Sequence, residues 1–361
     1  MNSADSFAAN YAGARTKFRD AAREAEGELE SVTHPDRGPD GGDLTTDIAW
    51  FGPRSAGSVL VTISATHGVE GFCGSGAQVD WLRRGEVSRL PSGVAVLMIH
   101  AINPFGFAWL RRVTEDNVDL NRNWVDFTAP LPANAGYDRL SHAICPAEWT
   151  QEARAASDEA LGAFAAEHGF AALQQAITGG QYTHPAGLFY GGAAATWSRR
   201  TQSDILRQHL TEAARVAVID YHTGLGPWGY GEQIVTDRRG SAAFARAASW
   251  WGAAITSPAD GTSTSADISG DGLGALGALL PHAEVTGMAL EVGTQSVMEV
   301  LAALRADAWL HARGDLGSPQ GRMIKAQVRN AFFGDADDWK GMVAGQSLLA
   351  TRQAIEGLTK G

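Results

Sequence analysis

The chain has 361 residues, of which 44% are hydrophobic and 19% are charged. This balance excludes an intrinsically disordered chain, and the length suffices for an α/β protein with insertions. Asp and Glu total 40 against 29 Lys and Arg, which gives a net charge of −11, so a nucleic-acid partner is not expected. No run of about 18 apolar residues occurs, so no membrane span is expected.

The chain contains only two cysteines, Cys73 and Cys145, and neither belongs to a C-x-x-C pair. Two cysteines do not make a disulfide framework, so a reducing compartment fits this composition. Residues 1–10 lack the basic and apolar regions of a secretory signal peptide. We therefore expect a cytoplasmic protein.

The N-terminal part predicts two helices and two strands. Apolar residues recur at steps of three and four over residues 5–30, which predicts an amphipathic helix. Residues 34–42 (HPDRGPDGG) predict a turn-rich break. Two short apolar stretches, 47–51 and 58–65, predict strands, and the second has the continuous apolar character of a strand buried on both faces. A helix is expected over 74–84.

The middle of the chain follows a different pattern. After another buried strand over 94–101, residues 126–210 are rich in Ala and contain no regular apolar strand. Helical patches are expected over 148–168 and 200–215, with a Gly-rich loop over 179–192. We interpret 126–210 as helices and a long loop inserted into a sheet domain.

The C-terminal part alternates again between strands and helices. Strands are expected over 215–221, 232–236, 253–256 and 288–292. Helices are expected from residue 297 onward, most clearly over 297–310. Short apolar strands that alternate with helices indicate an α/β fold, with a mixed, mostly parallel central sheet flanked by helices on both faces. We expect residues 1–361 to form a single domain, with 126–210 as its helical insertion.

Histidines and glutamates stand at the ends of three expected strands. His67 and Glu70 follow the strand over 58–65, His222 follows the strand over 215–221, and Glu291 lies in the strand over 288–292. Functional groups gather at the carboxyl ends of strands in open α/β sheets, so these side chains are expected to meet. Two imidazoles and a carboxylate with an open fourth position form a known hydrolytic zinc set.

Each of these residues also has a simpler interpretation when taken alone. With ten histidines in the chain, an H-x-x-E match can arise by chance. His222 could be a hydrogen-bonded core histidine, and Glu291 could belong to a buried ion pair. The coincidence of all four residues at strand ends favours a metal site, with Glu291 as the base for a bound water.

A polar segment rich in arginine, residues 111–124, follows the strand over 94–101. Arginine grips a carboxylate with a planar fork that lysine lacks. Asn121 and Arg122 could therefore clamp the free carboxylate of a substrate. A salt-bridged surface loop containing Asp116 and Asp119 is the alternative interpretation.

The order and approximate spacing of these residues resemble the zinc carboxypeptidase superfamily. The resemblance rests on His67-x-x-Glu70, Asn103-Pro104, the run DLNRNW over 119–124, Asp220-Tyr221-His222 and Glu291. It is greatest for bacterial members of uncharacterised function and for the succinylglutamate desuccinylase/aspartoacylase branch. It covers roughly residues 45–125 and 215–295 and implies the carboxypeptidase-like α/β fold.

The resemblance implies a metal site and a catalytic base at matching positions. His67, Glu70 and His222 would hold one Zn²⁺ ion, and Glu291 would be the general base and later the proton donor. Asp220, two residues before His222, would be structural or would orient the ligand imidazole.

The resemblance also implies substrate-binding roles. Asn121 and Arg122 would hold the substrate carboxylate, and Arg112, or less directly Arg111, would polarise the scissile carbonyl and stabilise the oxyanion. The tyrosine that digestive carboxypeptidases use has no clear counterpart here. The candidates are Tyr190, in the sequence GLFYGG, and Tyr182 and Tyr230.

The predicted function is cleavage of an amide bond next to a free carboxylate, in a small molecule or short peptide. Carboxypeptidase and N-acyl amino acid deacylase activity share every chemical step, so both stay open. A catalytically silent binding protein with the same fold is a further alternative, and homo-oligomers are possible. A serine hydrolase is disfavoured because Gly74-Ser75-Gly76 lacks the G-x-S-x-G pattern.

Overall fold

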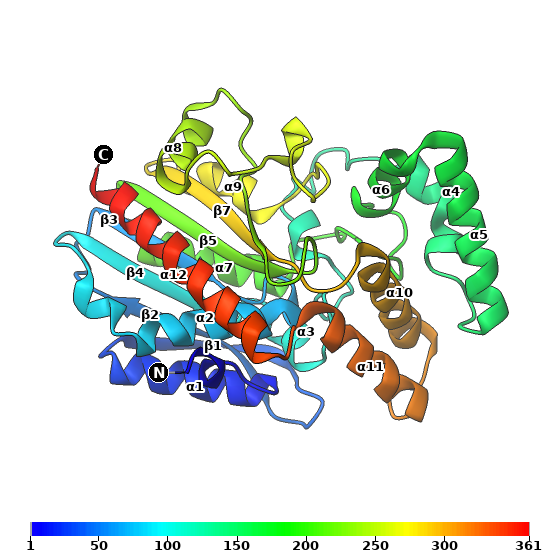
Figure 1. Cartoon of the computed structure of the whole chain (residues 1–361), viewed down its shortest axis with the longest axis horizontal. Helices are drawn as coiled ribbons and strands as arrows, with labels where there is room; N and C mark the ends of the chain where they lie inside the picture. Colours follow the sequence, from blue (N-terminus) through cyan, green and yellow to red (C-terminus); the bar gives the residue numbers. More distant parts are fainter. Residues whose placement is uncertain (1, 361) are drawn as a thin grey trace.

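The computed structural model describes residues 2–360 and is built around a mixed β-sheet covered by helices (Figure 1). Within these residues the sheet has seven strands in the order β1-β2-β4-β3-β5-β7-β6. The strands are β1 (Glu28–Arg37), β2 (Asp43–Phe51), β3 (Ser58–Ile63), β4 (Val94–His100), β5 (Arg215–Thr223), β6 (Gly231–Ile234) and β7 (Glu284–Val292). The central strands β4, β3, β5 and β7 are parallel, whereas β1, β2 and β6 join antiparallel at the two sides. The predicted α/β class is confirmed.

Helices cover both faces of the sheet. They are α1 (Tyr11–Glu24), α2 (Gly71–Arg83), α3 (Pro104–Ala108), α4 (Ala135–Ile144), α5 (Gln151–His168), α6 (Phe170–Thr178), α7 (Trp197–His209), α8 (Ala242–Trp251), α9 (Gly272–Leu279), α10 (Val297–Arg313), α11 (Pro319–Phe332) and α12 (Asp337–Thr359). Among residues 2–360, none of these helices combines the length and the apolar character needed to cross a membrane.

The alternation of side chains along the strands builds a core on each face. In β5, Ala217 and Ile219 pack in the core shared with α1, α2 and α12, whereas Val216 and Val218 pack in the core shared with α7 and α9. All four residues are fully buried. This explains the continuous apolar runs in the sequence, because a strand buried on both faces has no polar side to show.

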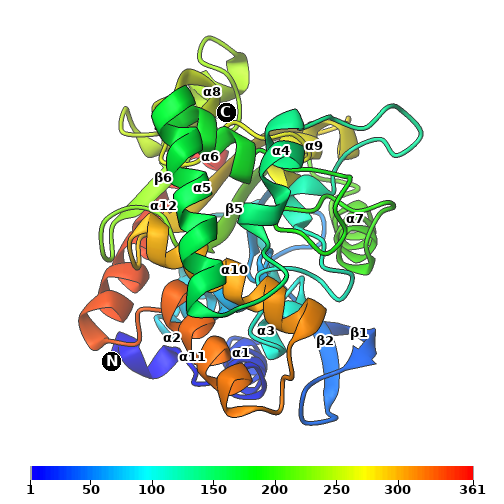
Figure 2. The same cartoon turned by 90° about the vertical axis from the view of Figure 1, so that its right-hand side faces the viewer.

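Helices α4, α5 and α6 pack against one another at one end of the molecule, beside α10 (Figures 1 and 2). They come from the segment 126–210, for which helices were predicted. Each of α4 and α5 begins at a capping side chain: the Asn134 side chain accepts a hydrogen bond from the Tyr137 amide, and Thr150 does the same for Ala153.

Two local predictions are wrong. Residues 34–37, expected in a turn, belong to β1, and residues 253–256, expected as a strand, form only a bridge from Thr256 to Ile234. The outer strand β1 is almost entirely exposed, so it carries no apolar signal and is held by its pairing with β2. The helix expected over 5–30 is shorter, since α1 begins after its cap Asn10 and ends at Glu24.

Candidate metal centre

The structure brings the predicted ligands together at the carboxyl ends of the parallel strands. His67 follows β3, Glu70 ends a short 3₁₀ turn (Gly68–Glu70) that leads into α2, and His222 is the penultimate residue of β5. One ligand atom from each of the three lies within 4.8 Å of the others. All three side chains are buried, so few of their polar atoms face water.

The distances between these donor atoms suit one small cation. Nδ1 of His67 lies 3.1 Å from Glu70 Oε1, Nδ1 of His222 lies 3.0 Å from Glu70 Oε2, and the two Nδ1 atoms are 3.1 Å apart. Ligands about 2.0–2.1 Å from zinc in a tetrahedron are separated by roughly 3.3 Å. Two histidines and a carboxylate are also the donor set that zinc prefers, so these residues fit the ion.

The outer nitrogens of both imidazoles are held by carboxylates. His67 Nε2 lies 3.1 Å from Asp119 Oδ1, and His222 Nε2 lies 3.0 Å from Asp220 Oδ2. Asp220 is itself fixed by the Thr66 hydroxyl, at 2.8 and 2.9 Å from its two oxygens. A proton held on each Nε2 leaves the lone pair of each Nδ1 directed at the shared centre, as is usual for metal-bound histidines.

Arg112 lies among the charged groups around the ligands. Its Nη1 donates to Glu70 Oε1 at 2.7 Å, and its Nε donates to Asp119 Oδ2 at 3.2 Å. Burial alone would raise the pKa of the Asp119 carboxyl, but the charges of Arg112 and Arg122 hold it well below its usual value. Arg112 Nη2 also lies 2.9 Å from His67 Nε2, a contact that cannot be a hydrogen bond while that nitrogen donates to ionised Asp119.

The turn between the first two ligands is fixed by a close backbone approach. A Cβ at Gly68 would lie 2.1 Å from the carbonyl carbon of Gly106, so only glycine fits there. The amides of Gly68 and Val69 donate to the carbonyls of Arg112 and Arg111 at 3.0 and 2.8 Å. The ligand turn and the arginine segment are therefore held together through their backbones.

Glu291 stands beside the ligands on the neighbouring strand. In the parallel pairing of β5 with β7 it lies opposite His222. Its Oε1 accepts a hydrogen bond of 2.9 Å from the Leu225 amide. Burial, reinforced by the negative charge of Glu70, raises the pKa of Glu291 to about 7, even though His222 and the Leu225 amide act in the opposite direction. Such a carboxyl group can both take and return a proton near neutral pH.

Asn121 and Arg122 line the same pocket as the ligands. Asn121 Oδ1 accepts a hydrogen bond of 3.2 Å from the Gly272 amide, and Arg122 donates to the carbonyls of Asn121 and Thr178. The Nε of Arg122 has no hydrogen-bond partner within residues 2–360. This nitrogen is buried, and the Nη1 of Arg122 lies 3.8 Å from Asp119 Oδ1, so the guanidinium forms an ion pair with Asp119.

Arg111 and Tyr190 lie outside this pocket's lining. Arg111 is buried and donates to Asp307 and Asn117, at 3.0 and 2.8 Å. The Tyr190 carbonyl accepts the Asp119 amide at 2.8 Å, so its contribution is made through the backbone. Both residues support the segment that carries Arg112 and Asp119.

Two contributors were not expected at the site from the sequence. Asp119 was named in the run DLNRNW and in the alternative of a surface loop but was given no role at the site, yet it is fully buried and lies 3.1 Å from His67 Nε2. Phe189 lies under both Arg112 and Arg122, with its ring centre 5.7 and 5.4 Å from the guanidinium carbons. The position of Asp119 beside the Asn-Arg pair was a usable signal, whereas nothing in the Gly-rich segment distinguished Phe189.

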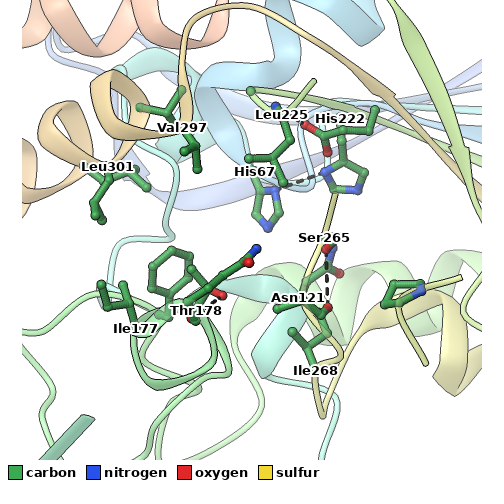
Figure 3. Close-up of a pocket in the computed structure, with 18 of the residues that line it drawn as sticks. His67, Asn121, Ile177, Thr178, His222, Leu225, Ser265, Ile268, Val297 and Leu301 are labelled. Atoms are coloured by element: carbon green, nitrogen blue, oxygen red, sulfur yellow. Dashed lines mark hydrogen bonds between the residues drawn. The ribbon is translucent and has the colours of Figure 1, made fainter. Parts of the chain in front are cut away.

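The pocket has a volume of about 190 Å³ and extends away from the histidines between the strand ends and the helices α5, α6 and α10. Figure 3 shows His67 and His222 on one side of it, with Asn121 and Ser265 in one direction and Ile177, Val297 and Leu301 in the other.

Fold and site together define an α/β protein with a buried His-Glu-His group suited to one divalent metal ion. The chain belongs to the family described as "Protein of unknown function (DUF2817)", whose model matches residues 7–346. No curated protein sequence matches it.

Solved structures of low sequence identity are similar to the chain. Carboxypeptidase A from Helicoverpa armigera is 12% identical with a TM-score of 0.47, over 89% of this chain and 73% of that one. A metallo-carboxypeptidase from Burkholderia cenocepacia is 11% identical with a TM-score of 0.45, over 94% and 68%. A succinylglutamate desuccinylase/aspartoacylase family protein from Shewanella amazonensis is 17% identical with a TM-score of 0.36, over 80% and 73%. Both branches that the sequence resembles are thus among the similar structures.

Proposed function

We propose that this protein is a zinc-dependent hydrolase that cleaves an amide bond next to a free carboxylate. The observation that carries the proposal is the convergence of two Nδ1 atoms and one carboxylate at 3.0–3.1 Å, with each outer Nε2 held by its own carboxylate. Groups that only stabilised the core would not need three acceptor atoms aimed at one point.

His67, Glu70 and His222 would hold the ion, which would supply an activated water and a positive charge for the scissile carbonyl. Glu291 is suited to take the proton of the attacking water and to return it to the nitrogen of the leaving amine. The raised pKa of this carboxyl group, about 7, supports both transfers.

In this proposal Arg112, Asn121 and Arg122 bind different parts of the substrate. Arg112 would stabilise the negative charge that develops on the carbonyl oxygen, a contribution often worth several kcal/mol. Asn121 and Arg122 would bind the free carboxylate of the substrate. The place of both residues in the pocket lining supports this assignment.

The test combines metal content with hydrolysis. Purified protein is expected to bind one zinc per chain and to cleave dipeptides or N-acyl amino acids, losing the activity with a chelator and regaining it with zinc. Matched substrates whose carboxylate is amidated should be poor. Zinc binding well below one per chain, or hydrolysis that persists after the metal is removed, would contradict the proposal.

A further inference from the structure

One side of the pocket is mostly apolar and carries no charged side chain, with Gln174 and Thr178 as its polar residues. The lining side chains from α5, α6 and α10 include no charged residue within the described part of the chain, whereas the charged lining residues come from the strand ends and the loops. Ile177, Val297 and Leu301 lie together on this side in Figure 3. A charged substrate group placed here would lose its hydration without gaining a partner.

The apolar lining continues to the surface of the protein. Phe170, at the start of α6, and Val297 and Met298, at the start of α10, all line the pocket and yet are 57%, 45% and 58% exposed. Single exposed apolar residues are ordinary, but three around one opening form an apolar entrance. The pocket therefore offers an apolar path from the metal ligands to solvent.

The position of the carboxylate site decides which part of the substrate would occupy this path. In Figure 3, Asn121 lies below His67, whereas Val297 and Leu301 lie to the left of it. A substrate whose carboxylate is held at Asn121 and whose amide lies at the metal ligands would direct its acyl group toward α6 and α10.

We propose that the substrate is an N-acyl amino acid whose acyl group is an aliphatic chain of several carbons, bound between α6 and α10. This inference rests on the proposed function and names its substrate class. Hydrolysis breaks the bond between the carbonyl carbon and the nitrogen: the carbon gains the hydroxyl of water and the nitrogen gains a proton, so the products are an aliphatic carboxylic acid and a free amino acid.

The first experiment measures kcat/KM of the zinc-loaded protein for N-acyl glycines with acyl chains from acetyl to decanoyl. Each methylene that becomes buried is expected to raise kcat/KM by up to about fourfold, until the chain reaches the pocket opening. A parallel series with a fixed acetyl group and lengthening amino-acid side chains should show a much weaker trend. Equal kcat/KM for acetyl and octanoyl substrates, or a stronger trend in the side-chain series, would overturn the proposal.

Two matched variants test the location of the chain. Met298→Glu places a charge at the pocket entrance, and Met323→Glu places the same charge on α11, where Met323 is 71% exposed and does not line the pocket. Met298→Glu is expected to lower kcat/KM for octanoyl-glycine at least about tenfold more than for acetyl-glycine, because a charged side chain opposes apolar burial. Met323→Glu should change neither, and equal effects of the two variants would contradict the assignment.

A binding measurement separates this inference from the proposed function. Calorimetry with metal-free protein should show octanoyl-glycine binding more tightly than acetyl-glycine, with the difference lost in Met298→Glu and kept in Met323→Glu. If this pattern holds while no compound is hydrolysed, the apolar site stands and the proposed hydrolase fails. If hydrolysis occurs but no chain-length preference appears in either measurement, the hydrolase stands and the aliphatic substrate is wrong.

Discussion

The pocket has two different walls: a strand-end wall that carries His67, His222 and Glu291, and a helical wall formed by α5, α6 and α10. On the strand-end wall, charged groups are buried and hold one another in place: the exposed fractions of His67 and His222 are 3% and 4%, and each imidazole has a carboxylate behind it. On the helical wall most lining side chains are apolar, and Phe170, Val297 and Met298 at its rim are about half exposed. The difference teaches that, under the proposed function, the strand-end wall would determine the chemistry and the helical wall would determine which substrates bind.

The largest effect is expected from removing a ligand on the strand-end wall. His222→Ala should weaken zinc binding by several kcal/mol, or more than about a thousandfold, because it removes one of three ligands. Metal analysis after dialysis checks this, and circular dichroism should show a retained fold. His142→Ala, at an exposed position on α4, is the control. Full zinc content in His222→Ala would show that His222 is not a ligand.

The second largest effect is expected at Glu291, the proposed general base. Glu291→Gln keeps the shape of the side chain but cannot accept a proton, so kcat should fall by roughly 10²–10⁴ while the zinc content stays at one per chain. Glu284→Gln, at the exposed start of the same strand, should leave kcat unchanged. An unchanged kcat in Glu291→Gln would remove this residue from the mechanism.

A smaller effect is expected at Asp220, which contacts the proposed ligand His222. Asp220→Asn weakens the hold on the His222 ring without touching the ion, so zinc affinity or activity should fall about 10–100-fold. Competition with a chelator of known affinity measures the change. If this substitution instead changes the selectivity for acyl length, the two walls do not have the separate roles proposed for them.

A substitution outside both walls, at Asp47, is expected to change the free energy of unfolding without changing the site. Asp47 on β2 accepts hydrogen bonds from Arg15 and Ser31, at 2.7 and 2.5 Å. Burial raises its pKa, but these partners lower it to a value below that of a free Asp. A lowered folded-state pKa stabilises the protein above the unfolded pKa of about 4, and this contribution disappears as the pH falls through the folded value.

Asp47→Asn should therefore reduce the free energy of unfolding by about 2 kcal/mol at pH 7 and by clearly less at pH 3. Urea denaturation at both pH values measures the difference, and zinc content should not change. Asp20→Asn, which removes an exposed ion pair with Arg23, should cost under about 1 kcal/mol. A loss for Asp47→Asn that is equal at both pH values would show that its carboxylate is not the source.

The smallest effect is expected on the helical wall. Phe170→Ala should change the free energy of unfolding by less than about 0.5 kcal/mol, because the side chain is 57% exposed. It should raise KM a few-fold for long-chain substrates only. Leu349→Ala, on α12 and 56% exposed, should change neither quantity. A loss of zinc in Phe170→Ala would show that the two walls are not independent.

The sequence by itself determined the buried strands and the places of the proposed ligand residues. Strands buried on both faces must be apolar along their whole length, and chemistry that occurs at strand ends must place polar groups just after them. For that reason β3, β4, β5 and β7, and with them His67, Glu70, His222 and Glu291, could be expected at one edge of the sheet. The outer strand β1 could not, because its residues are exposed and its only specification is pairing with β2.

Only the tertiary structure decided which side chains surround His67 and Arg112 and how the helical wall is arranged. Asp119 orients His67 across 52 residues of sequence, and Phe189 reaches Arg112 from a separate loop. The apolar pocket brings α6 beside α10, more than a hundred residues later in the chain. Apolar side chains on a helix look the same in sequence whether they face a core or a substrate, since both remove the same surface from water.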